Sequence, residues 1–153
     1  MHAIFCGDLV VAQEPPKTAI VFPIIAPRVS SKFGRRIHPI RKFSRQHQGV
    51  DLAAPENSHV RAIIAGRIVF AGPHAGYGKL VTVDHGRGYA SLYAHLSEIK
   101  VKIGQEVSAG TLLGRVGSSG QATGPHLHFE WRKEGEAFDP LVVFPSLAEI
   151  SEG

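Results

Sequence analysis

The segment spanning residues 124–131 carries the side chains best suited to chemistry. Its sequence, Gly-Pro-His-Leu-His-Phe-Glu-Trp, alternates polar and apolar residues with the period of a β-strand. The apolar residues predicted to face a core are Leu127, Phe129 and Trp131. His126, His128 and Glu130 then share an open face on a rigid strand, which is the presentation that a metal site or a proton-transfer site needs.

A histidine and a carboxylate occur upstream at a spacing of four, as His47 and Asp51. Gly49 and the nearby Pro55 favour extended chain over helix, although both conformations allow the two side chains to reach one point. Val50 is predicted to face the core. A lone His-x-x-x-Asp pattern is common by chance, so it gains weight only beside other groups.

A further histidine, His95, lies in an alternating run that follows a predicted hairpin turn at residues 85–88. Strict alternation puts His95 on a polar face together with Ser91 and Tyr93. The opposite, apolar face consists of Leu92, Ala94 and Leu96. The prediction is therefore a third histidine on the polar face of a strand.

These groups match the requirements of a catalytic zinc site. Such a site uses three protein ligands, often a mixture of histidine and carboxylate, and leaves one position for water. Hydrolysis also needs groups that move a proton and stabilise an oxyanion. Three ligands plus two helpers would use His47, Asp51, His95, His126 and His128. The chemistry alone does not decide which histidine of the His-x-His pair is the ligand.

Length and composition predict one domain made mainly of short β-strands and turns. The 153 residues suffice for one core, and 17 glycines with 10 prolines disfavour long helices. We expect an N-terminal extension at 1–17, the domain at 18–144 and a C-terminal tail at 145–153.

Two local predictions concern the chain on either side of the His-x-x-x-Asp pair. Residues 30–39 contain Gly and Pro, which argue against a regular element and favour a loop near the site. Residues 60–64 and 67–71 are β-rich runs that flank Gly66, and this pattern is typical of a hairpin.

The charge favours anionic partners. The formal net charge is +4 and the sequence pI is near 9.5, which suits nucleic acid, phosphorylated polymers or anionic cell-wall material. The basic residues are scattered, however, and no basic stripe with interleaved aromatics is present, so we expect no nucleic-acid partner.

The single cysteine, Cys6, excludes an internal disulfide and a cysteine-based zinc site. No apolar run approaches the roughly 20 residues that span a bilayer, so we expect no transmembrane segment. The N-terminal stretch is mildly apolar but has no Lys or Arg before Lys17 and no clear cleavage pattern, so it shows no clear signal peptide.

Five short segments follow one another along the chain: Phe33-Gly34-x-Arg36-x-His38-Pro39, His47-x-x-x-Asp51, Asp84-His85-Gly86, Tyr93-x-His95-Leu96 and Gly124-Pro125-His126-Leu127-His128-Phe129-Glu130. Their order and approximate spacing resemble those of the lysostaphin/LytM-type zinc endopeptidases, peptidase family M23. The likeness extends over about residues 22–140. Each segment is a weak signal alone, whereas five in register are specific.

The resemblance implies an antiparallel β-sandwich of barrel-sandwich type with zinc in a groove walled by loops. It implies that His47, Asp51 and His128 bind one Zn²⁺, while His95 and His126 act on the water and the tetrahedral intermediate. The implied enzyme is a zinc metalloendopeptidase that hydrolyses peptide cross-links or stems of bacterial peptidoglycan. The implied location is the cell envelope, periplasmic or secreted, and we expect a monomer. Neither the bond cleaved nor the substrate-binding residues are indicated.

Two alternatives compete with this interpretation. The turn-rich stretch at residues 101–113 also resembles a biotinyl or lipoyl carrier barrel, but Lys100 and Lys102 lie in a predicted strand rather than at a hairpin tip. The more serious alternative is a non-catalytic relative of the same fold that binds cell wall or activates another hydrolase. Such relatives usually lack zinc ligands, and here every ligand position is occupied, which favours the enzyme.

Overall fold

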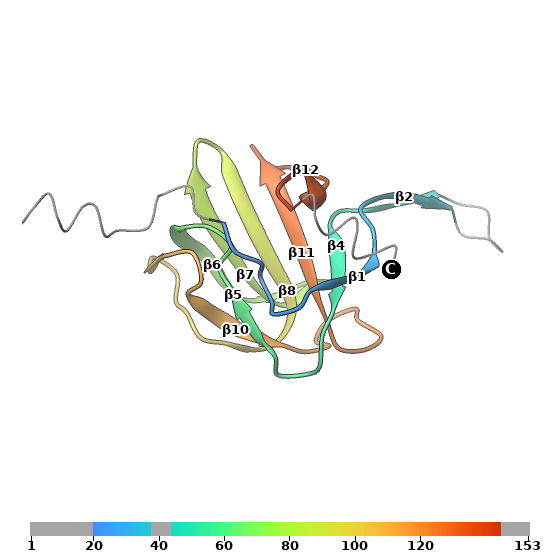
Figure 1. Ribbon diagram of the computed structural model, residues 1–153, viewed down its shortest axis with the longest axis horizontal. Coiled ribbons are helices and arrows are strands. Elements are labelled where there is room, and N and C mark those ends of the chain that lie inside the picture. Colours follow the sequence, from blue (N-terminus) through green and yellow to red (C-terminus); the bar gives the residue numbers. More distant parts are fainter. Residues whose placement is uncertain (1–19, 38–43, 145–153) are drawn as a thin grey trace, which may run out of the picture.

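The computed structural model describes residues 20–37 and 44–144 (Figure 1). These residues form β-strands and a single 3-10 turn at Pro140–Val142. The strands are β1 Arg28–Ser31, β2 Gly34–Ile37, β3 Ser44–His47, β4 Val50–Ala53, β5 His59–Arg61, β6 Gly66–His74, β7 Gly78–Gly86, β8 Tyr89–Ile99, β9 Glu106–Val107, β10 Leu112–Val116, β11 His126–Lys133 and β12 Glu136–Phe138. The expected all-β fold is confirmed.

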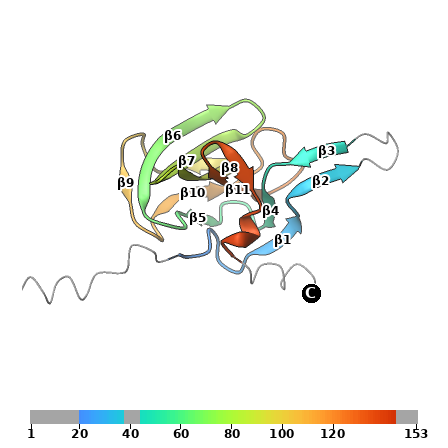
Figure 2. The ribbon, with the colours of Figure 1, turned by 90° about the horizontal axis from the view of Figure 1, so that it is seen from above.

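All strand pairs are antiparallel, and most strands belong to one ten-stranded sheet. Its main path runs β1-β4-β11-β8-β7-β6-β9, with β12 beside β11 and with β10 joining β5 to β8. β2 and β3 form a separate pair that projects away from the large sheet, at the end where β1 and β4 lie (Figures 1 and 2). The large sheet remains open.

The core lies where this sheet curls over, with β5 and β10 across from β6 and β7 (Figure 2). Val60 from β5, Leu113 from β10, and Ile68 and Val83 from β6 and β7 are fully buried in one cluster. The predicted inward residues of β11, Leu127, Phe129 and Trp131, belong to the same cluster. Burial of this apolar surface is the main source of stability.

Strand β8 bends at His95 and thereby joins the two arms of the sheet. Residues 89–94 pair with β11, whereas residues 96–99 pair with β10. His95 itself has a left-handed backbone, with φ of 63°, and the pairing with β7 shifts register there. A positive φ is uncommon for a residue other than glycine, and such strain concentrates at functional sites.

The faces predicted for β8 are wrong. Tyr93 lies in the main core, not on a polar face, and its ring packs on Phe129. Leu92 and Ala94 instead lie on the same face of the sheet as His128 of β11. After the bend Leu96 returns to the main core. Both faces of β8 are buried, so alternation along its sequence could not distinguish them.

Two other local predictions are wrong. β5 pairs with β10 and β6 pairs with β7 and β9, so the runs on either side of Gly66 do not form a hairpin with each other. The segment 30–39, expected to be irregular, contributes the end of β1 and all of β2. The hairpin turn at residues 85–88 is confirmed, since Gly86 pairs with Tyr89. The extension at 1–17, with Cys6, and the tail at 145–153 lie outside the described residues.

A chain of hydrogen bonds, buried at Tyr93 and Ser91, links β8 to the loop before β6. Ile63 N–H donates to the Tyr93 hydroxyl oxygen (3.0 Å), Tyr93 O–H to Ser91 Oγ (2.7 Å), and Ser91 O–H to His85 Nε2 (2.8 Å). The His85 Nδ1–H then donates to the Ala65 carbonyl at 2.9 Å. Each donor finds one acceptor only when the His85 imidazole is neutral, and burial lowers the pKa of His85.

Acid should therefore destabilise the fold through His85. Its folded-state pKa lies below the unfolded value near 6.5, so its stabilising contribution is complete above that value and is lost as the pH falls below it. We expect His85→Gln to flatten the fall in unfolding free energy below pH 6.5, by up to about 1.4 kcal/mol per pH unit. Urea unfolding at a series of pH values measures this. His59→Gln, at an exposed position of β5, is the matched control. Equal slopes in wild type and His85→Gln would contradict the prediction.

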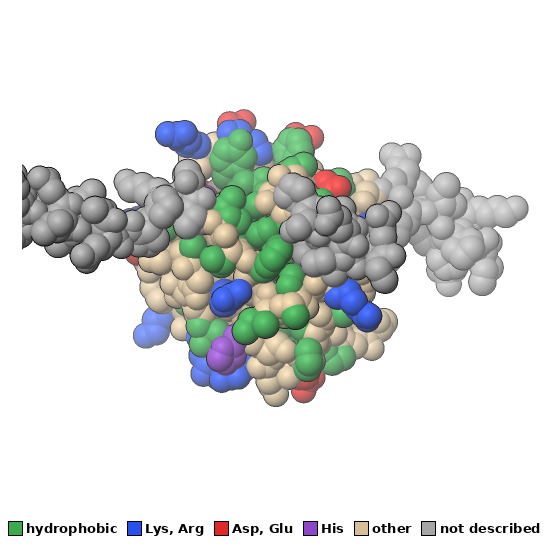
Figure 3. All heavy atoms as spheres, in the orientation of Figure 1, with side chains coloured by type: hydrophobic (Ala, Val, Ile, Leu, Met, Phe, Trp, Pro, Cys, Tyr) green, Lys and Arg blue, Asp and Glu red, His purple; other side chains and the backbone are tan. Residues whose placement is uncertain are grey.

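Basic side chains stand singly or in small groups around the face of the molecule shown in Figure 3, with apolar side chains between them. The described part of the chain contains no helix of the length and hydrophobicity that membrane crossing requires.

Candidate metal centre

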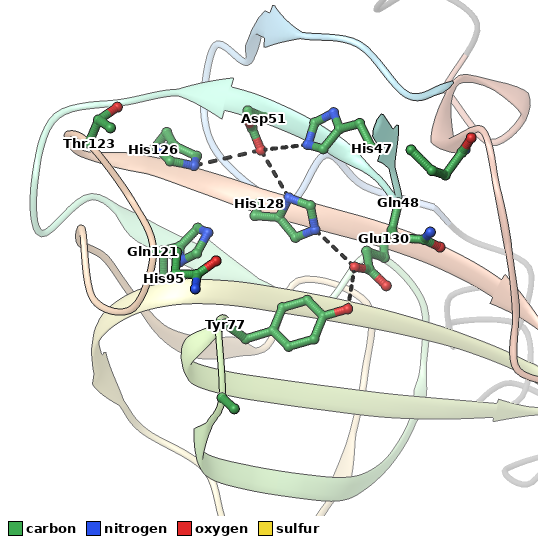
Figure 4. A pocket seen from close by; sticks show the side chains of 13 residues that line it. His47, Gln48, Asp51, Tyr77, His95, Gln121, Thr123, His126, His128 and Glu130 are labelled. Carbon is green, nitrogen blue, oxygen red and sulfur yellow. Dashed lines mark hydrogen bonds and ion pairs between the residues drawn. The ribbon is translucent and has the colours of Figure 1, made fainter. Parts of the chain in front are cut away.

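A pocket of about 370 Å³ opens on the face of the sheet opposite the core. Its floor comes from β4, β8 and β11, and its walls come from the three loops after β3, β6 and β10. The residues that line it are Gln46, His47, Gln48, Asp51, Ala75, Gly76, Tyr77, His95, Gln121, Thr123, His126, His128 and Glu130. All five site residues expected from the sequence are among them (Figure 4), and the expected loop-walled groove is confirmed.

Neighbouring strands place Asp51 and His128 directly opposite one another. Asp51 of β4 is the register partner of His128 of β11, so the two side chains leave the sheet side by side. His47, the last residue of β3, brings its ring next to Asp51. The chain between His47 and Asp51 passes close to β11, since a Cβ at Gly49 would lie 2.2 Å from the Phe129 carbonyl oxygen. Only glycine allows this approach.

The donor atoms of these three residues suit one metal ion. Asp51 Oδ1 lies 3.3 Å from His47 Nε2 and 2.9 Å from His128 Nδ1, and the ligand atoms of the three residues all lie within 4.8 Å of one another. Tetrahedral zinc ligands bound at 2.0–2.2 Å stand roughly 3.3 Å apart. Two imidazoles and one carboxylate are a usual ligand set for catalytic zinc. The residues present therefore fit the ion.

The electrostatics of the site favour positive charge. Burial alone would raise the pKa of Asp51, but hydrogen bonds from His128 and His47 outweigh it and hold this pKa well below its usual range. Burial opposes the charged form of His128, yet hydrogen bonds to Asp51 and Glu130 raise its pKa to about 9. Carboxylates on both sides of His128 thus stabilise a cation at this place.

Each of the other three histidines has one ring nitrogen fixed by a main-chain carbonyl. The Nδ1–H of His47 donates to Lys32 (2.7 Å), that of His95 to Ser119 (2.7 Å) and that of His126 to Gly124 (2.9 Å). These tautomers follow from the acceptors around each ring. In each case Nε2 is the nitrogen left to bind a metal or a proton, and those of His47 and His126 lie 3.3 and 3.6 Å from Asp51 Oδ1.

The His95 and His126 rings lie next to each other, with centroids 5.0 Å apart. The Nε2 atom of His126 lies 3.6 Å from Asp51 Oδ1, farther than the nitrogens of His47 and His128. His95 is 7% exposed, and burial lowers its pKa, so that the neutral imidazole is the form present at pH 7.

Sequence reasoning missed two members of this site. Glu130 was expected on an open face, yet it is completely buried and accepts hydrogen bonds from His128 and Tyr77. Tyr77 lies 53 residues away in the turn between β6 and β7. The Gly-Tyr-Gly sequence at 76–78 marks a turn but does not indicate that the tyrosine reaches β11.

An all-β domain that brings two histidines and an aspartate to one point, with two more histidines beside them, has the build of a metal-dependent hydrolase. The chain belongs to peptidase family M23, whose family model matches residues 45–140. This match lies inside the domain expected at 18–144 and confirms the resemblance seen in the sequence.

Two curated relatives differ in the activity that their names state. The chain is 43% identical over 130 residues to the DD-carboxypeptidase/endopeptidase Mpg of Neisseria meningitidis serogroup B, covering 85% of this chain and 30% of that protein. It is 36% identical over 125 residues to the murein hydrolase activator EnvC of Escherichia coli, covering 82% and 29%. The chain thus spans less than a third of the length of these relatives.

Two solved structures with about one third sequence identity share the fold. A zinc-containing peptidase from Vibrio cholerae superposes with a TM-score of 0.76 at 32% identity, covering 80% of this chain and 39% of that one. The catalytic domain of lysostaphin from Staphylococcus simulans gives 0.68 at 33% identity, covering 80% and 92%. A family with a zinc-containing member, together with the His–Asp–His group found here, confirms the expectation of a zinc cofactor, one ion per chain.

Proposed function

We propose that this chain is a zinc-dependent endopeptidase domain that hydrolyses peptide cross-links or stems of bacterial peptidoglycan. The observation that carries the proposal is the convergence of three metal-ligand side chains and two further histidines in one open pocket. Family membership and the peptidoglycan enzymes among the relatives support it. They also support a place in the cell envelope, periplasmic or secreted.

In this proposal His47, Asp51 and His128 hold the ion. Zinc so bound supplies Lewis acidity and lowers the pKa of a coordinated water to about 7. His128 is preferred over His126 as the ligand because its Nδ1 is nearer to Asp51 Oδ1, at 2.9 Å against 3.6 Å for His126 Nε2.

His95 and His126 are assigned to the proton and the developing oxyanion. A neutral imidazole whose Nδ1–H is held by a carbonyl accepts a proton at Nε2, and the resulting imidazolium donates that proton again. His95, neutral because it is buried, suits the acceptor role. An Nε2–H of either ring can also donate to negative charge on the substrate oxygen.

Digestion of purified peptidoglycan of several chemotypes tests this proposal. We expect soluble peptide-linked products without chelator, none with chelator, and recovery when zinc is restored, because the ligand set gives the ion its place. Mass spectrometry of the products identifies the bond. His128→Ala is the matched protein control.

The likeness to a murein hydrolase activator defines the second candidate, a non-catalytic module of the same fold. Binding to peptidoglycan without any cleavage, at saturating zinc and on every chemotype, would contradict the enzyme and favour this module.

A further inference from the structure

A completely buried carboxylate stands behind His128, on the side away from Asp51. Glu130 is 0% exposed, and both of its oxygens are held. Its Oε1 accepts from His128 Nε2–H at 2.9 Å and from the Tyr77 hydroxyl at 2.7 Å. Its Oε2 accepts from Arg132 Nε at 2.7 Å and pairs with Nη2 at 2.6 Å. Figure 4 shows the line of contacts from Asp51 through His128 to Glu130 and Tyr77.

This support distinguishes His128 from the other histidines of the pocket. His47, His95 and His126 each meet a neutral main-chain carbonyl. His128 meets an ionised side chain whose charge is balanced by the Arg132 guanidinium. A carboxylate that accepts the remote N–H of a metal-binding imidazole fixes the tautomer and makes the ligand nitrogen more basic.

The tautomer that Glu130 selects is the one the metal group needs. In the neutral ring that would bind a metal, a proton on Nε2 donates to Glu130 and leaves the Nδ1 lone pair for the ion, beside Asp51 Oδ1, which lies 2.9 Å from Nδ1. With the proton on Nδ1, that lone pair would be lost, and the Glu130 oxygen would face the lone pair of Nε2. The buried carboxylate therefore excludes the second arrangement.

Tyr77 connects this support to the other histidine pair. Its hydroxyl donates to Glu130, and its main-chain carbonyl accepts the backbone N–H of His95 at 2.8 Å. It lies in a turn that is packed against the loop before β11, since a Cβ at Gly78 would come within 2.4 Å of the Ser119 carbonyl carbon. One residue thus contacts both halves of the site.

We propose that Glu130, held by Tyr77 and Arg132, is the positioning residue that sets His128 as a zinc ligand through Nδ1. Tyr77 acts through Glu130, because its hydrogen bond holds the carboxylate that orients His128. The inference rests on the proposed function in one respect, which is that His128 binds the ion. It adds that the affinity for zinc depends on residues that do not touch the metal.

The test measures zinc affinity of the whole chain by competition with a chromogenic chelator. We expect Glu130→Gln to weaken zinc binding by about 10- to 100-fold, the usual cost of losing such a partner. Tyr77→Phe should weaken it in the same direction by a smaller factor, because Glu130 keeps its bonds to His128 and Arg132. Glu136→Gln on β12 and Tyr89→Phe, at exposed positions of the same sheet, should leave the affinity unchanged.

A second measurement separates positioning from general stability. Long-range ¹H–¹⁵N spectra of the zinc-loaded protein should show His128 protonated at Nε2 only, and that signal should shift in Tyr77→Phe. A purely structural role would lower the unfolding free energy of the zinc-free protein and leave zinc affinity and this signal unmoved. If Glu130→Gln does not fold, Tyr77→Phe decides alone.

The zinc affinities of these variants distinguish the positioning role of Glu130 from the ligand role of His128. Wild-type zinc affinity in both Glu130→Gln and Tyr77→Phe, with loss of zinc in His128→Ala, would overturn the positioning role and leave the proposed function standing. Retention of zinc in His128→Ala would instead overturn the ligand assignment on which both depend.

Discussion

Replacing His128 with alanine is expected to abolish zinc retention and peptidoglycan hydrolysis together. His128 is 8% exposed and lies between Asp51 and Glu130, whose carboxylates both contact its ring. Without the imidazole only His47 and Asp51 remain to bind the ion, and two ligands do not hold a catalytic zinc. Zinc content measured by mass spectrometry should fall from about one ion per chain to about none, with turnover at background.

His126→Ala, two positions away on β11, is the matched control for His128→Ala. It removes an imidazole from the same face of the same strand but leaves the three residues proposed as ligands, whose ligand atoms lie within 4.8 Å of one another. It should keep zinc and lose turnover. A fully active His128→Ala would contradict the ligand assignment. Loss of zinc from His126→Ala, with zinc retained in His128→Ala, would show that the two histidines have been assigned the wrong way round. Circular dichroism and thermal unfolding establish that each variant is folded.

Removal of the His95 imidazole should leave zinc in place and lower turnover by about 10²- to 10⁴-fold, the usual contribution of a positioned acid or base. His95 is not among the three residues proposed as metal ligands, and its Nδ1–H is bound to the Ser119 carbonyl. His95 lines the pocket, where its other ring nitrogen can exchange a proton.

The choice of substitution at His95 depends on the backbone. With φ of 63°, alanine would combine the loss of the ring with strain in the left-handed region. Asparagine tolerates that region and cannot carry the proton. His95→Asn is therefore the cleaner variant, and we expect wild-type zinc content, wild-type stability and a turnover reduced as above. Loss of zinc from His95→Asn would mean that ligand and proton-transfer residues have been confused.

The histidine strand was predictable because its alternation is strict and only one of its faces enters the main core. Leu127 and Phe129 are fully buried as expected, and this fixes the direction of His126 and His128. The pair His47 and Asp51 was predictable from spacing, although the chain between them leaves one sheet and enters another.

The place of His95 could not be read from alternation. Ser91 and Tyr93 enter the core because their hydroxyl groups are satisfied by one another and by His85, so polar residues occupy an apolar face. Leu92 packs on the opposite face in a second, smaller cluster. His95 reaches the pocket because the strand bends there, and no local residue pattern predicts that bend.

The burial of Glu130 could not be predicted from alternation either. A carboxylate in an alternating strand is expected in solvent, because burying an unpaired charge is costly. Here Arg132, two residues further on, and Tyr77 from another hairpin compensate the charge. The first partner could be suggested by proximity in sequence, whereas the second depends on how β7 and β8 pair.

Anomalous diffraction at the zinc absorption edge, from crystals of the zinc-loaded protein, would locate the metal ion and identify its ligands. We predict one strong peak in the pocket, bound by His47 Nε2, Asp51 and His128 Nδ1, with a coordination position left to solvent. A peak ligated by His126 or His95 in place of His128, or an ion enclosed by four protein ligands, would contradict it.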